Sequence, residues 1–227
     1  MKLNYLRKGE RLDNLGDGVD IIQNPAFFSY GTDAVLLADF AVLRKGDNII
    51  DLCSGNGVIA LLLSKKTCES ITSLELLPQN IDMARRSAQM NGLSNRLRFH
   101  EGCVKRVSEY FPAASFSVVT INPPYIPVGA GRVNPNFELA VARHELACSL
   151  EDCIAAARRL LTPSGRLYMA HKPERLPEIF CVLRAYKLEP KTLLLVQKRD
   201  LPPAIALIEA RNGGRAGLKV LPNKIIL

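Results

Sequence analysis

Four consecutive residues, Asn122-Pro123-Pro124-Tyr125, follow a short apolar segment and combine hydrogen-bond acceptors with an aromatic ring. An amino nitrogen conjugated with a ring or a carbonyl is a poor nucleophile, because its lone pair is delocalised. Two acceptors, the Asn122 side-chain carbonyl and the Pro123 backbone carbonyl, can pull such a nitrogen toward a tetrahedral geometry. Two prolines fix φ at about −65° and donate no hydrogen bond, so they hold the acceptors rigidly. Asn122, Pro123, Pro124 and Tyr125 are therefore the predicted catalytic residues, which act by positioning.

The ring of Tyr125 offers a face to a flat base, an interaction worth roughly 1–3 kcal/mol. A Pro-Pro turn that only ends a strand is the alternative interpretation of the tetrapeptide. The neighbouring Asn and Tyr argue against it. No general base is needed before the nitrogen attacks, since its proton can leave to water afterwards.

A glycine-rich turn stands between two apolar segments upstream, and it reads Cys53-Ser54-Gly55-Asn56-Gly57. Glycines at a strand-to-helix turn let the backbone approach a ligand closely. The turn therefore predicts a site for a nucleoside-containing cofactor. The spacing of Gly55, Gly57 and Ala60 also fits the dinucleotide fingerprint, which by itself is a weak signal. Cys53, Gly55, Asn56 and Gly57 are predicted to contact the cofactor.

The acid Asp51, four residues before Gly55, separates the two cofactor classes. Unit charges ~4 Å apart interact by about 4 kcal/mol at an effective dielectric of 20, so Asp51 would repel a pyrophosphate by that order. S-adenosyl-L-methionine has no phosphate and carries a cationic amino group and a sulfonium. Asp51 therefore favours this methyl donor. Glu75 and Leu76 follow the next apolar segment, where Glu75 would accept hydrogen bonds from ribose hydroxyls unless it is an ordinary solvated acid.

Short apolar runs alternate with longer amphipathic stretches, which is typical of a parallel sheet covered by helices on both faces. The predicted strands are 48–52, 70–74, 96–100, 116–121, 166–170, 192–196 and 205–210. The predicted helices are 58–66, 78–91, 104–110, 149–161 and 173–186. The sequence thus predicts an α/β fold with a seven-stranded, mostly parallel sheet. An N-terminal lobe (1–46) would pack over the cofactor site of the main domain (47–227).

The chain carries 30 Lys and Arg against 22 Asp and Glu, a net charge of +8. This excess favours a polyanionic partner such as nucleic acid, although a merely basic enzyme would show it too. The six cysteines are scattered without a CxxC pair, so we expect reduced, mostly buried thiols and no metal. No run approaches the ~20 apolar residues of a membrane helix. We expect a soluble, cytoplasmic protein; the sequence leaves its oligomeric state open, and a monomer is compatible with it.

The segment containing Tyr30-Gly31-Thr32-Asp33, the glycine turn and the tetrapeptide follow one another in this order. In this combination the chain resembles the class I N6-adenine methyltransferases of bacterial tRNA, especially the family that modifies the adenine next to the anticodon of valine tRNA. The resemblance covers nearly the whole chain, including 142–145 and 212–215. It implies a class I methyltransferase (Rossmann-like) fold in which residues 28–33 close over the methionine end of the cofactor. A helix cap is the alternative role for Thr32 or Asp33.

The same resemblance implies that the substrate is RNA, in particular tRNA near the anticodon. Tyr125, Arg132, Arg143 and Arg215 are the predicted RNA contacts, and the Gly- and Pro-rich stretch 128–136 is a candidate substrate lid. Asn122 would also border the cofactor. Gly102 and Cys103 follow the third predicted strand. Methyltransferases often carry an Asp at the position of Cys103 for the adenine amino group, so this adenine contact departs from the pattern.

Three other functions remain open at this point. The tetrapeptide also suits the amide of a protein glutamine, but enzymes of that kind usually carry a long helical substrate lobe, and only 46 residues precede Asp47. An adenine-N6 methyltransferase of DNA would need a target-recognition domain, which the sequence does not suggest. A non-catalytic subunit that binds S-adenosylmethionine would not need an intact tetrapeptide.

Overall fold

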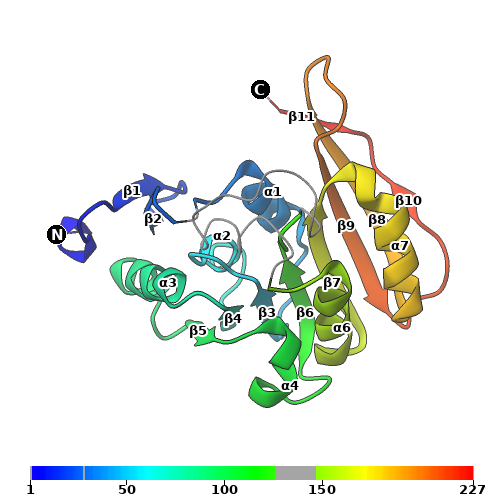
Figure 1. Ribbon diagram of the computed structural model, residues 1–227, viewed down its shortest axis with the longest axis horizontal. Helices are drawn as coiled ribbons and strands as arrows, with labels where there is room; N and C mark the ends of the chain where they lie inside the picture. Colours follow the sequence, from blue (N-terminus) through cyan, green and yellow to red (C-terminus); the bar gives the residue numbers. More distant parts are fainter. Residues whose placement is uncertain (1, 28, 126–146, 227) are drawn as a thin grey trace.

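The computed structural model describes residues 2–27, 29–125 and 147–226 (Figure 1). Their central sheet has nine strands in the order β10-β8-β9-β7-β6-β3-β4-β5, with β11 also pairing with β8. The strands are β3 (Ile49–Leu52), β4 (Ile71–Glu75), β5 (Leu97–Glu101), β6 (Phe116–Ile121), β7 (Leu161–His171), β8 (Leu188–Lys198), β9 (Ile205–Asn212), β10 (Lys219–Val220) and β11 (Lys224–Ile226). Only β9 runs antiparallel to its neighbours, so the predicted mostly parallel α/β sheet is confirmed.

All seven predicted strands are present, but the predicted number of strands is wrong by two. The additional strands β10 and β11 contain two and three residues and pair with the edge strand β8. Such short segments carry no period-2 pattern that a sequence could reveal. They form because β8 offers unpaired backbone groups along its outer edge.

Helices cover both faces of the sheet, as predicted. The residues of β3 alternate: Ile49 packs with α1 (Thr32–Phe40), α2 (Val58–Leu63) and α3 (Pro78–Met90), whereas Ile50 packs toward the opposite face. That second face is covered by α4 (Val107–Tyr110), α6 (Leu150–Leu160) and α7 (Leu176–Ala185). Successive side chains of a strand point to opposite faces, so one buried strand contributes to two apolar cores.

The predicted helices differ from the observed ones mainly at their ends. The helix predicted at 58–66 ends at Leu63, and the one at 104–110 divides into a 3-10 turn, η2 (Val104–Arg106), and α4. The helix predicted at 173–186 likewise begins as the 3-10 turn η3 (Pro173–Arg175) before α7. The start of α6 is fixed by a capping box between Ser149 and Asp152. Among the described helices, none has the length and apolar character needed to cross a membrane.

The N-terminal residues form a 3-10 turn, η1 (Lys2–Tyr5), and a hairpin that was not predicted, β1 (Arg11–Asn14) with β2 (Asp20–Gln23). The hairpin packs on α3 (Figure 1). There the backbone amide of Ile22 donates to Ser87 Oγ at 3.0 Å. Helix α1 shares one apolar core with α2 and the sheet. The boundary between residues 46 and 47 remains a prediction.

Candidate functional site

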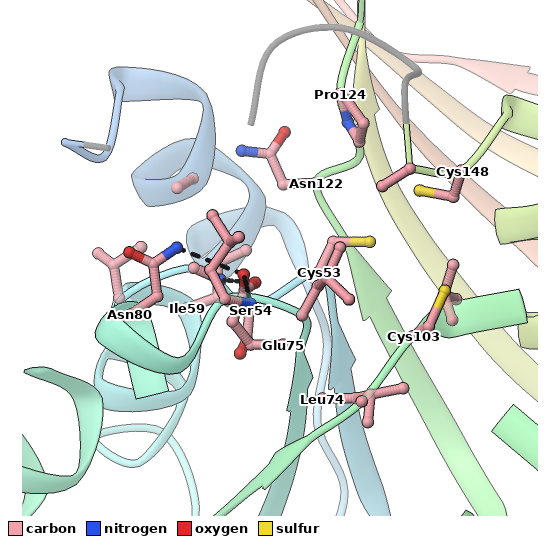
Figure 2. A pocket seen from close by; sticks show the side chains of 18 residues that line it. Cys53, Ser54, Ile59, Leu74, Glu75, Asn80, Cys103, Asn122, Pro124 and Cys148 are labelled. Atoms are coloured by element: carbon pink, nitrogen blue, oxygen red, sulfur yellow. Dashed lines mark hydrogen bonds between the residues drawn. The ribbon is translucent and has the colours of Figure 1, made fainter. Parts of the chain in front are cut away.

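A cavity lies at the carboxyl ends of the parallel strands, where open α/β sheets bind their ligands (Figure 2). Seven of the predicted cofactor residues line it: Cys53, Gly55, Glu75, Leu76, Gly102, Cys103 and Asn122. The others do not belong to its lining: Tyr30, Gly31, Thr32, Asp33, Asp51, Asn56 and Gly57. The cavity thus lies at the strand ends, beside half of the predicted cofactor residues, and the contacts of all of them with a cofactor remain a prediction.

Glu75 stands at the end of β4 and is held by the chain around it. One carboxylate oxygen accepts from the Gly55 backbone amide at 2.8 Å, and the other accepts from the Leu77 amide at 2.9 Å and from Asn80 Nδ2 at 3.3 Å (Figure 2). Only 8% of Glu75 is exposed, and this burial raises the pKa of its carboxyl group. An ordinary solvated acid is thus the wrong interpretation of Glu75. Its fixed carboxylate at the cavity wall suits hydroxyl donors such as those of a ribose.

Asp51 lies beneath the glycine turn and is fully buried. It pairs in register with Thr120 of β6, whose hydroxyl donates to Asp51 Oδ1 at 2.7 Å. No described residue donates to Asp51 Oδ2. Burial raises the pKa of this carboxyl group to about 8. A buried carboxyl oxygen without a hydrogen-bond partner is rare and costly, and a cationic group brought by a ligand would supply a partner and favour the ionised form of Asp51.

Two residues of the glycine turn, Asn56 and Gly57, have structural roles. Gly57 has φ +82°, and an added Cβ would lie 2.8 Å from the Phe99 ring, so this glycine is required for the turn itself. The buried side chain of Asn56 donates to the Ile22 backbone carbonyl at 3.2 Å, which ties the turn to the N-terminal hairpin. Gly55, at φ +53°, lines the cavity. Of these three predicted cofactor contacts, only Gly55 therefore borders the ligand space.

The tetrapeptide predicted to be catalytic contacts the N-terminal segment through Asp33. Asp33 Oδ2 accepts from Asn122 Nδ2 at 3.2 Å and from the Tyr125 hydroxyl at 2.6 Å, and that hydroxyl also contacts Asn122 Oδ1. Because a carboxylate without a proton only accepts, Asp33 fixes which end of the Asn122 amide faces it. Gly31 is the N-cap residue of α1, so neither Thr32 nor Asp33 holds the capping position, but Asp33 Oδ1 accepts from the Ala34 backbone amide at 3.0 Å within the first turn.

The end of β7 contributes a group of residues that sequence reasoning missed. The His171 ring lies 4.9 Å from the Tyr125 ring, measured between centroids, and Lys172 Nζ lies 5.8 Å from the Tyr125 ring centroid. Arg175 Nη1 donates to the Tyr125 backbone carbonyl at 3.3 Å. Burial lowers the pKa of His171 to about 4, which keeps its imidazole neutral. A signal existed: His171 and Lys172 directly follow a predicted strand, as Asn122 does.

The structure does not show the four predicted RNA contacts lying side by side. Arg132 and Arg143, like the lid candidate 128–136, lie outside the described residues, as does Phe28. Arg215 follows β9, which runs antiparallel to its neighbours. It therefore lies near the amino ends of the parallel strands, whereas the tetrapeptide lies at their carboxyl ends. Its backbone carbonyl accepts from Lys191 Nζ at 3.0 Å. A contact of Arg215 with the same nucleotide as Tyr125 therefore has no support in the fold.

Comparison with known proteins identifies the family to which this sequence is similar. The family described as "Methyltransferase domain" matches residues 43–203. The tRNA1(Val) (adenine(37)-N6)-methyltransferase of Aeromonas salmonicida is 28% identical over 160 residues, which cover 70% of this chain and 65% of that enzyme. The enzyme of the same name from Parabacteroides distasonis is 27% identical over 182 residues, covering 79% and 75%. The match thus spans less than two thirds of the Aeromonas enzyme.

Solved structures support the fold. A predicted O-methyltransferase from Agrobacterium tumefaciens superimposes with a TM-score of 0.68 at 23% identity, covering 86% of this chain and 87% of that one. A geranyl diphosphate C-methyltransferase from Streptomyces coelicolor, solved with S-adenosyl-L-homocysteine, gives 0.59 at 14% identity and covers 79% and 78%. At such identities the likeness concerns the fold alone. It confirms the predicted class I methyltransferase architecture.

Proposed function

Since this chain belongs to the methyltransferase domain family, we propose that it transfers a methyl group from S-adenosyl-L-methionine to N6 of an adenine in RNA, with tRNA near the anticodon as its substrate. The family match confirms the expected cofactor. The observation that carries the proposal is the Asn122 amide, fixed by Asp33 at the wall of the cavity. An amide held in this way suits a planar amino nitrogen.

The residues in and beneath the cavity fit the cofactor. Glu75 presents a fixed carboxylate for ribose hydroxyls. Asp51, which lies beneath the glycine turn and outside the cavity lining, has a buried oxygen without a donor that suits a cationic amino group. Ser54 Oγ and Asn56 Oδ1, at the same turn, are also buried without a partner among the described residues. Polar atoms buried in this way call for a polar ligand. When bound, the cofactor supplies an electrophilic methyl group on a sulfonium.

The tetrapeptide then positions the nucleophile. Asn122 Oδ1 and the Pro123 carbonyl accept the two N–H groups of the adenine amino nitrogen and turn its lone pair toward the methyl carbon. A nitrogen–carbon bond forms while the carbon–sulfur bond breaks, and the excess proton on nitrogen passes to water. Holding the reactants in line supplies most of such an acceleration. The reaction therefore requires no titratable group of the protein.

The choice of RNA as acceptor rests on charge and on the relatives. The chain carries a net charge of +8, and Lys172 stands over the Tyr125 ring, beside the place proposed for the base. Lysine and arginine side chains contact phosphates and fix the register of a nucleic acid. We add Lys172 to Arg132 and Arg143 as proposed RNA contacts. The relatives named above carry tRNA in their names.

One assay tests the proposal. The protein is incubated with S-adenosylmethionine labelled in its methyl group and with tRNA, genomic DNA or cell protein, and the labelled nucleoside or amino acid is identified. We expect N6-methyladenosine in tRNA, formed on the order of 10²-fold more slowly with Asn122→Ala. Label in protein glutamine or in DNA would replace the proposed acceptor. Cofactor binding without any transfer would indicate a non-catalytic subunit.

A further inference from the structure

Three cysteines that lie far apart in the sequence meet at the cavity wall. Cys53 follows β3, Cys148 precedes α6, and Cys153 lies within α6. Their three sulfur atoms all lie within 4.8 Å of one another, and the Cys148 and Cys153 sulfurs are 3.6 Å apart. We call these three residues the thiol cluster. Figure 2 shows the Cys53 and Cys148 side chains directed toward each other.

The fold holds the thiol cluster in place from two sides. Cys53 has φ +55°, a left-handed conformation that non-glycine residues rarely adopt and that is often kept for function. On the other side, the capping box of Ser149 and Asp152 fixes the first turn of α6, and with it the spacing of Cys148 and Cys153. Cys153 is fully buried and Cys148 nearly so. The sulfurs therefore face one another with little freedom to separate.

The remaining cysteines do not share this arrangement. Cys68 and Cys181 are exposed, and the expectation of mostly buried thiols is wrong for both. Cys103 lines the same cavity but does not belong to the thiol cluster. The clustering is therefore a property of three particular residues, and the other cysteines provide matched controls.

The spacing of the sulfurs suits a single thiophilic cation. Zn–S bonds of about 2.3 Å at tetrahedral angles place sulfurs ~3.8 Å apart, so the widest pair needs to approach by about 1 Å. Thiolates select soft or borderline ions such as Zn²⁺ and Cu⁺. We propose that Cys53, Cys148 and Cys153 form a three-thiolate site for one such cation, Zn²⁺ being the first candidate. Cys53 and Cys148 line the cavity, so the fourth coordination position opens toward the cofactor.

The geometry of the three sulfurs favours a cation over a disulfide. A disulfide needs sulfurs about 2.05 Å apart, well below the 3.6 Å between Cys148 and Cys153, and it would leave the third thiol out. A bound cation would tie the cofactor turn to the start of α6, and it would stabilise the native state only.

Cobalt titration of the full-length protein tests the site. The protein is reduced, freed of metal with a chelator and titrated with Co²⁺ without oxygen, and the thiolate-to-cobalt absorption is followed before displacement by Zn²⁺. We expect one ion per chain, and a rise in melting temperature on adding Zn²⁺. Cys153→Ser should weaken cobalt affinity at least tenfold, as should Cys53→Ser, which is the second variant should Cys153→Ser not fold. Cys103→Ser and Cys68→Ser should bind as the wild type does.

Three outcomes would overturn the site. The first is a wild-type protein that shows no thiolate-to-cobalt absorption. The second is equal loss of affinity in Cys103→Ser or Cys68→Ser, which would mean that the cluster is not the ligand set. The third is peptide mapping that finds a Cys148–Cys153 disulfide after mild oxidation while the reduced protein retains no metal, which would make the cluster a redox pair. None of these measurements depends on the identity of the methyl acceptor.

Discussion

Binding of S-adenosylmethionine should release about one proton from the protein near neutral pH, and Asp51 should be its source. Burial raises the pKa of the Asp51 carboxyl to about 8 in the free protein, so this group is about nine tenths protonated at pH 7. The cofactor brings a cationic amino group. A cation ~4 Å away at an effective dielectric of 20 favours the carboxylate by about 4 kcal/mol, which is roughly three pKa units.

The expected pKa of Asp51 in the complex is therefore near 5, and at pH 7 about 0.9 proton leaves on binding. The affinity should rise about tenfold per pH unit between roughly pH 5 and pH 7. Above that range the amino group of the cofactor itself loses its proton, since α-amino groups titrate at about 7.7–8.0. The measurement therefore belongs below pH 7.5.

Titration calorimetry in two buffers of different ionisation enthalpy gives the number of protons released directly. Asp51→Asn should bind without proton release and with an affinity that hardly changes with pH. Asp17→Asn, which alters an exposed acid away from the cavity, should behave as the wild type. Wild-type enthalpies that do not depend on the buffer would refute the reasoning, and so would proton release that persists in Asp51→Asn.

The remaining predictions concern turnover and cofactor affinity. Asn122→Ala should lower kcat by on the order of 10²-fold, as loss of one preorganised polar group does elsewhere, with an unchanged cofactor Kd by calorimetry. Asp33→Asn should lower kcat by about 10- to 100-fold through misorientation of Asn122, and a changed cofactor Kd instead would restore its predicted cofactor role. Glu75→Gln should weaken cofactor binding by roughly 10-fold or more, measured in the same way. With cofactor saturating, kcat should stay flat from about pH 6 to 8, because the pKa values of Tyr125 and His171 lie outside that range; a bell-shaped profile would contradict this.

Local pattern was enough to predict the main elements of the fold. Strands such as β3 and β6 are short, mostly apolar segments because both of their faces are buried. Pro78 and Asn91-Gly92 mark the ends of α3. The hairpin β1–β2 was missed because its residues are mostly polar and it depends on contacts with α3. Its stability comes from residues about 65 to 71 positions away, which no local window contains.

Of the candidate site, the sequence predicted the residues at strand ends but not the contacts between distant segments. Residues at strand ends, such as Gly55, Glu75 and Asn122, were found because the carboxyl ends of parallel strands share one edge. The contacts of Asp33 with Asn122 and Tyr125 were not predicted, because these hydrogen bonds join residues 89 and 92 positions apart in the chain. For the same reason a search for closely spaced cysteines, such as a CxxC pair, did not reveal the cluster of Cys53, Cys148 and Cys153, because Cys53 comes from a different part of the chain.

Asp33 also explains how the tetrapeptide can receive a substrate without leaving a donor unpaired. The Tyr125 hydroxyl has one proton and two neighbouring acceptors, Asp33 Oδ2 and Asn122 Oδ1. An adenine amino group that binds Asn122 Oδ1 competes only for the second acceptor, so the Tyr125 proton stays with Asp33, 2.6 Å away. Burial and the nearby Asp33 raise the pKa of Tyr125 well above its ordinary value, which keeps that proton in place at neutral pH. In the proposed mechanism Asp33 thus completes the site, because without it Asn122 Oδ1 would be the acceptor for both the Tyr125 hydroxyl and the substrate amino group.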